Sequence, residues 1–179
     1  MSTALLIIDV QRGLFDPEPR PYEADTVVER INALAAKARR RQRPVIFIQH
    51  EQASGTLEYG SDSWQLQRQL EPAPADYFTR KTTPDSFLRT DLQPLLDSLG
   101  IRRLVLCGYA SEFCVDTTAR RAAALGYAVQ IAADAHTTHD KAHATAATIR
   151  AHENATLPQI ASFGVPITAQ PSTAIHFEE

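Results

Sequence analysis

The chain has 179 residues and a formal net charge of −3 at pH 7, so it lacks the positive excess typical of proteins that bind nucleic acid or anionic membranes. Its hydrophobic fraction of 44% suffices for the core of a single globular domain, which we expect to span residues 1–179. No apolar run approaches the roughly 20 residues of a membrane helix, and the first run stops at Asp9, which argues against a signal peptide. The two cysteines fall in different predicted elements, so we expect free thiols and a cytoplasmic protein.

Apolar runs alternate with segments of helical periodicity along the chain. The run at 4–10 is continuous, as expected for a central parallel strand that is buried on both faces. We predict further strands at 45–49, 76–79, 103–107, 128–133 and 165–169, and helices at 23–41, 90–99, 114–125 and in a last segment that ends near 154. Strands that alternate with helices favour a mainly parallel, doubly wound sheet in three α/β/α layers.

Two segments between the strands have less regular patterns. Residues 50–74 contain turn-forming glycines, and Trp64, Leu66 and Leu70 favour one short helix there. The sequence Thr90-Asp-Leu-Gln93 matches a capping box, which predicts that a helix begins at this point.

Cys114 stands where a strand is followed by a turn and a helix. Gly108 ends the apolar strand, and helical spacing begins at Cys114. The free N–H groups and the positive dipole end of a helix N-terminus favour a thiolate over a thiol, whose ordinary pKa is about 8.5. Cys114 is therefore either an activated nucleophile or a small core residue, and the local context leaves both open. Cys107, in the middle of the strand, is expected in the core.

Reactive side chains follow the ends of the predicted strands. In open parallel sheets, active groups gather at the carboxyl ends of the strands. This rule selects Asp9, His50, Lys81, Cys114, Asp134 and His136. A carboxylate as close to the core as Asp9 needs a partner, and with Lys81 it could form a plain ion pair or part of a catalytic site. A carboxylate that accepts the thiol proton and a cation beside both form a coherent nucleophilic site with Cys114.

Four sequence segments occur in a fixed order over most of the chain. They are Leu5-Leu-Ile-Ile-Asp-Val-Gln11 with Phe15-Asp16, Lys81 with Ser86-Phe87, Gly108-Tyr-Ala-Ser-Glu-Phe-Cys114-Val115, and Asp134-Ala135. In this order they resemble the isochorismatase-like cysteine hydrolases, a family that includes nicotinamidases and several amidases. The resemblance implies a Rossmann-like doubly wound fold and a catalytic triad of Asp9, Lys81 and Cys114. It also implies a cis peptide between Tyr109 and Ala110, with the backbone N–H groups of Ala110 and Cys114 as an oxyanion hole.

The resemblance further implies cleavage of a C–N amide bond in a small molecule through a thioester on Cys114, without a cofactor. Two alternatives remain: vinyl-ether hydrolysis, as in isochorismatases proper, and a catalytically idle member that serves as an oligomeric binding module. The segments Gly60-Ser-Asp-Ser-Trp64 and Asp134-Ala-His-Thr-Thr138 resemble the amidase branch that includes streptothricin hydrolase.

We predict no metal site. Nicotinamidases that resemble this chain hold a metal with an aspartate and several histidines after the second strand, whereas His50 is the only histidine in that region here. His139 and His143 have i, i+4 spacing, but no third ligand at a favoured spacing accompanies them and His136.

Aromatic and imidazole side chains near the same sheet edge are candidates for a substrate wall, although loop aromatics also serve as core or dimer contacts. These candidates are Phe15, His50, Tyr59, Trp64, Tyr109, Phe113 and His136. Because members of the family commonly assemble, we expect a homo-oligomer, either a dimer or a tetramer, acting on a small molecule.

Overall fold

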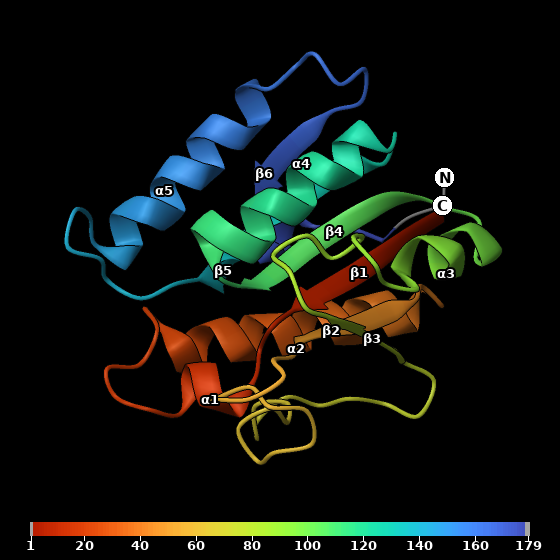
Figure 1. The fold of residues 1–179 in the computed structure, drawn as a ribbon. Helices are drawn as coiled ribbons and strands as arrows, with labels where there is room; N and C mark the ends of the chain where they lie inside the picture. Colours follow the sequence, from red (N-terminus) through yellow and green to blue (C-terminus); the bar gives the residue numbers. More distant parts are fainter. Residues whose placement is uncertain (1, 178–179) are drawn as a thin grey trace.

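The computed structural model describes residues 2–177 and is built on one six-stranded sheet (Figure 1). Its strands are β1 (Ser2–Ile8), β2 (Val45–His50), β3 (Tyr77–Lys81), β4 (Ile101–Tyr109), β5 (Ala128–Thr137) and β6 (Ile167–Gln170). They lie in the order β3-β2-β1-β4-β5-β6, and neighbouring strands are parallel. The predicted doubly wound parallel sheet is therefore confirmed. The expected single domain, 1–179, includes residues 1, 178 and 179, which lie outside the described residues.

Helices cover both faces of this sheet (Figure 1). They are α1 (Arg12–Phe15), α2 (Ala24–Arg40), α3 (Leu92–Ser98), α4 (Asp116–Ala124) and α5 (Ala146–Thr156), with 3-10 turns at Leu157–Gln159 and Ser172–Ala174. Leu5 and Ile7 of β1 pack in the same core as α2, whereas Leu6 and Ile8 face the core that contains α3 and α4. Successive strand residues point to opposite faces, so burial on both faces explains the continuous apolar runs of the sequence.

The strand order reverses between β1 and β4. After β1 the chain continues to β2 and β3 on one side, and then crosses to β4 on the other side. In such sheets the crevice at the carboxyl ends of the diverging strands is the usual binding site. Gly108 lets β4 approach β1 closely there: its φ is +117°, and a Cβ atom would lie 2.1 Å from the carbonyl oxygen of Ile8.

Two local predictions were wrong. The segment from Trp64 to Leu70 forms no helix, because its backbone pairs with the chain that leaves β1: Leu66 bridges to Gln11, and the N–H of Gln67 donates to the carbonyl of Val10 at 2.9 Å. The predicted capping box is absent as well. Helix α3 begins at Leu92, and its N-cap residue is Asp91, whose side chain makes no capping hydrogen bond. The hydroxyl of Thr90 donates to the carbonyl of Ser86 at 2.7 Å and accepts the N–H of Leu92 at 3.3 Å.

The elements around Cys114 also differ from the prediction. A π-helical turn, Ser111–Val115, contains Cys114, and α4 begins only after it. Strand β5 extends to Thr137, so Asp134 and His136 lie within the strand instead of following it. Residues 2–177 include no helix with the length and apolar character needed to cross a membrane.

Candidate active site

Asp9, Lys81 and Cys114 come together at the carboxyl ends of the strands. The Nζ atom of Lys81 donates to Oδ2 of Asp9 at 2.7 Å and to the carbonyl oxygen of Thr83 at 3.1 Å, and lies 3.3 Å from Sγ of Cys114. The side chains of Lys81 and Asp9 are 0% and 2% exposed. The structure therefore places the ammonium group between the carboxylate and the sulfur, where it can stabilise negative charge on either.

His50 is a fourth member of this cluster. Its Nδ1 atom lies 3.1 Å from Nζ of Lys81, and an ammonium group can only donate, so the imidazole must accept. Burial first, and then the charge of Lys81, lower the pKa of His50. The side chain of Gln11, which is fully buried, holds the backbone of His50 with bonds of 2.8 and 2.9 Å to its N–H and carbonyl groups.

The thiol of Cys114 is not the thiolate that its place before a helix suggested. Burial, and then the carboxylate of Asp9, raise the pKa of Cys114 to about 12, and these effects outweigh the opposite effect of Lys81. These surroundings favour a protonated sulfur in the resting site. Within the described part of the chain, Oδ1 of Asp9 is buried and has no hydrogen-bond partner, so it is placed to accept the thiol proton.

The cluster offers three metal-ligating side chains, but they do not fit a metal ion. Ligand atoms of Asp9, His50 and Cys114 lie within 4.8 Å of one another. The ammonium group of Lys81, however, contacts all three, at distances of 2.7, 3.1 and 3.3 Å. A metal at their centre would meet a second positive charge in a site with little water, which costs free energy. That the protein binds no metal remains a prediction.

The turn that carries Cys114 has an unusual backbone. The peptide between Tyr109 and Ala110 is cis in this structure, as the resemblance implies. The carbonyl oxygen of Ala110 accepts the N–H groups of both Phe113 and Val115 at 3.1 Å. Single π-helical turns of this kind are frequent at functional sites.

Two of the candidate substrate-wall residues, Phe15 and His136, are 0% exposed and lie inside the protein. Phe15 packs in the core beneath α2 and meets Tyr109 edge-on, with ring centroids 5.9 Å apart. His136 is occupied by hydrogen bonds to Ser111 and Asn154. Tyr109 and Phe113 lie in the chain segment around the cis peptide and Cys114, and Phe113 is 53% exposed.

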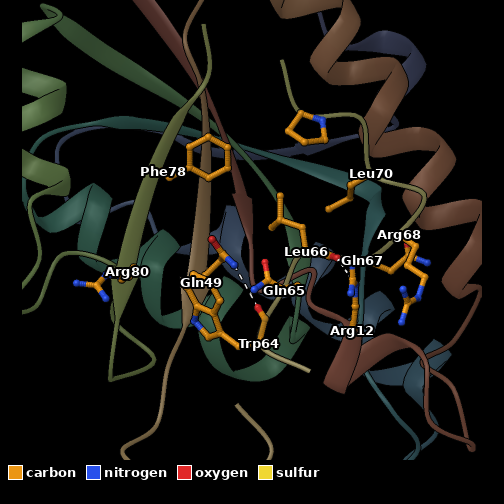
Figure 2. A pocket seen from close by; sticks show the side chains of 11 residues that line it. Arg12, Gln49, Trp64, Gln65, Leu66, Gln67, Arg68, Leu70, Phe78 and Arg80 are labelled. Atoms are coloured by element: carbon orange, nitrogen blue, oxygen red, sulfur yellow. Dashed lines mark hydrogen bonds between the residues drawn. The ribbon is translucent and has the colours of Figure 1, made fainter. Parts of the chain in front are cut away.

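Trp64 lines a cavity of about 590 Å³ away from the cluster (Figure 2), and Tyr59 packs beside it. Gln49 and Arg80 line it together with Trp64. Because side chains alternate along a strand, Gln49 and Arg80 point away from the face that carries the adjacent His50 and Lys81. Tyr59 packs on Trp64, with ring centroids 4.9 Å apart, and under the guanidinium of Arg80. The structure thus places these aromatic residues on the opposite face of β2 and β3 from the ammonium group of Lys81.

Asp134 also lies apart from the cluster. Its carboxylate accepts the N–H of Ser172 at 2.7 Å and pairs with Arg30 at 3.4 Å, which fastens the C-terminal segment to β5 and α2. Sequence reasoning gave no role to Gln11, Ser111 and Asn154, since a polar residue in a loop or on a helix carries no periodic signal that reveals a buried partner.

The strand order and the cluster define a doubly wound α/β protein with a candidate nucleophile where the order reverses. The model of the isochorismatase domain matches residues 3–170, which is nearly the whole chain. The chain therefore belongs to the isochorismatase family of hydrolases, as its sequence motifs indicate.

Relatives and solved structures agree with this family. A streptothricin hydrolase from Streptomyces noursei is 38% identical over 138 residues, which cover 76% of this chain and 50% of that protein. A second streptothricin hydrolase from the same organism is 35% identical over 138 residues, with coverages of 76% and 55%. The chain thus spans about half the length of these relatives. The solved structure of an isochorismatase family protein is 38% identical, with a TM-score of 0.86 over 94% of this chain and 97% of that one.

Proposed function

We propose that this protein hydrolyses a C–N amide bond of a small molecule through a thioester on Cys114. The observation that carries the proposal is the cluster in which Lys81 contacts both Asp9 and the sulfur while Oδ1 of Asp9 has no partner among the described residues. The similarity to streptothricin hydrolases supports it.

In the first half of the reaction, Asp9 accepts the thiol proton as the sulfur attacks the amide carbonyl. The raised pKa of Cys114 favours a proton transfer to Asp9 that accompanies the attack. The backbone N–H groups of Ala110 and Cys114 stabilise the oxyanion, which is typically the largest contribution at such sites. Asp9 then gives the proton to the leaving amine, and the C–N bond breaks to leave the thioester.

In the second half, Asp9 takes a proton from water, which attacks the thioester and releases the acid. The departing sulfur recovers the proton from Asp9. Lys81 holds the carboxylate and donates to the sulfur, so it stabilises the negative charge that forms on either group. His50 is another acceptor of Lys81, so the three ammonium hydrogens are shared among Asp9, Thr83, His50 and the sulfur.

A panel of small primary and cyclic amides, including nicotinamide, tests the proposal by ammonia release and by mass spectrometry of ring-opened products. Cys107→Ala is the matched control for Cys114→Ala, because Cys107 is a buried core thiol in β4. We expect the wild type and Cys107→Ala to turn over the same amides and Cys114→Ala to be inactive.

Full turnover by Cys114→Ala would refute the covalent route. Cleavage of an enolpyruvyl ether alone would favour the vinyl-ether alternative. No turnover, together with a Cys114 that does not react with alkylating reagents even in alkaline solution, would favour the idle module. The homo-oligomer stays a prediction, which light scattering tests.

A further inference from the structure

A chain of buried and partly buried hydrogen bonds runs from α5 to the turn that carries Cys114. Nδ2 of Asn154 donates to the carbonyl oxygen of Ala133 at 2.8 Å. Oδ1 of Asn154 lies 2.9 Å from Nε2 of His136, and Nδ1 of His136 lies 2.8 Å from Oγ of Ser111. Ser111 and His136 are both 0% exposed. The chain therefore connects α5, β5 and the first residue of the π-helical turn.

The direction of each hydrogen bond follows from this geometry. Asn154 donates to Ala133 through its amide nitrogen, so its oxygen is the acceptor and Nε2 of His136 carries a hydrogen. Burial lowers the pKa of His136 to about 4, so the imidazole is neutral near pH 7 and Nδ1 has a free lone pair. The hydroxyl of Ser111 therefore donates to Nδ1, which fixes its orientation.

We infer that His136 is a positioning residue which, through Ser111, fixes the turn that presents the backbone N–H groups of Ala110 and Cys114 to the reacting carbonyl. The inference rests on the proposed function. Ser111 directly follows Ala110, and its carbonyl oxygen accepts the N–H of Asp116, the first residue of α4. Movement of Ser111 therefore moves both ends of the turn.

The hydrogen bond between Ser111 and His136 matters because an oxyanion hole works only when its donors are accurately placed. Its donors have to lie within about 2.7–3.1 Å of the developing oxyanion. A turn that shifts by a fraction of an ångström loses part of that stabilisation. Because the same turn carries Cys114, the sulfur shifts too, so its own reactivity has to be measured separately. His136 itself is 0% exposed and does not touch the substrate.

Two reactions of the same thiol separate these effects. With p-nitrophenyl acetate, the sulfur of Cys114 bonds to the acetyl carbon, the bond to p-nitrophenolate breaks and the thiol proton passes to Asp9, through an intermediate with an oxyanion. With iodoacetamide, the sulfur displaces iodide and no oxyanion forms. The ratio of the two rate constants, measured on one preparation, therefore reports the oxyanion donors separately from the reactivity of the sulfur.

Ser111→Ala removes the hydroxyl that donates to Nδ1 of His136. If that variant does not fold, His136→Leu tests the same hydrogen bond, because it removes the acceptor. We expect each variant to lower the ratio of the acylation rate constant to the alkylation rate constant about tenfold. This is a smaller effect than the loss of a whole oxyanion donor would have. His136→Asn keeps an oxygen acceptor close to the position of Nδ1 and should stay within about twofold of the wild type. The matched control is Ser86→Ala, which removes another serine hydroxyl that is 0% exposed and bonded at 2.8 Å, to Thr118, outside the turn. It should leave the ratio unchanged.

The outcomes distinguish this inference from the proposed function. Wild-type ratios in Ser111→Ala or His136→Leu would refute the positioning role and leave thioester formation standing. A wild-type Cys114 that is alkylated but never acylated would refute the thioester chemistry itself, and the role of His136 with it. An equal fall in Ser86→Ala would show a general loss of packing and also refute the inference.

Discussion

Lys81→Met should destabilise the fold strongly, because it leaves the carboxylate of Asp9 buried without its cation. The wild-type ammonium group contacts Asp9, Thr83 and His50, and its side chain is 0% exposed. Removal of one partner of a buried ion pair costs about 3–5 kcal/mol. With a urea m-value of about 2 kcal/mol per molar, a loss of about 4 kcal/mol lowers the unfolding midpoint by about 2 M.

Two further variants test whether the uncompensated charge of Asp9 causes the loss of stability in Lys81→Met. Asp9→Asn/Lys81→Met removes both charges, so the double variant should be more stable than Lys81→Met alone. Lys141→Met removes a lysine whose ion pair with Glu112 is partly exposed, and it should cost no more than about 1 kcal/mol. The measurement is urea unfolding of all three variants at neutral pH. If Lys81→Met costs less than Lys141→Met, or the double variant is the least stable, the uncompensated-charge explanation is wrong.

Further tests concern the thiol of Cys114, the buried carboxyl group of Glu153 and the backbone at Gly108. The carboxylate of Asp9 is one cause of the raised pKa of Cys114, so Asp9→Asn should lower that pKa while it abolishes hydrolysis. The pH midpoint of alkylation by iodoacetamide should then fall; an unchanged or higher midpoint would contradict the electrostatics. Burial raises the pKa of Glu153 from 4.5 to about 7, so the folded state is stabilised below pH 4.5 and loses that stability as the pH rises through 7. Glu153→Gln should therefore raise the urea midpoint more at about pH 8 than at about pH 4, and an equal change at both would refute the assignment. Gly108→Ala would place a Cβ 2.1 Å from the carbonyl oxygen of Ile8 and should lower Tm by roughly 10 °C or more, as calorimetry can check.

The sheet and the proximity of Asp9, Lys81 and Cys114 could be predicted from sequence because both depend on position along the strands. Strands buried on both faces produce apolar runs, and each run ends at the carboxyl edge of the sheet. Asp9 directly follows such a run, Lys81 is the last residue of the edge strand β3, and Cys114 lies in the turn after β4. Topology therefore predicts that the three residues share one edge of the sheet, whereas their hydrogen-bonding distances depend on side-chain packing.

The state of the thiol could not be predicted in this way. A helix N-terminus favours a thiolate, and Cys114 does precede α4. However, its burial and the carboxylate from β1, 105 positions earlier in the chain, raise the pKa of the thiol. Such distant contacts leave no trace in local sequence patterns.

Loop contacts explain the other failures. Leu66 and Leu70 have helical spacing, but the backbone of their segment bonds to the residues after β1. His136 follows a predicted strand, as Asp9 does, yet Ser111 and Asn154 hold it inside the protein. In both cases tertiary hydrogen bonds outweighed the local pattern.

Detection of an acyl group on Cys114 tests the central claim most directly. The first amide that the protein hydrolyses would be mixed with the enzyme, the reaction quenched in acid within the first turnovers, and the peptides analysed by mass spectrometry. We predict that the acyl part of the substrate is bound to the peptide that contains Cys114 and is absent in Cys114→Ala, which also does not release the amine. Hydrolysis at the wild-type rate by Cys114→Ala, with no acyl group on any peptide of the wild type, would contradict the account.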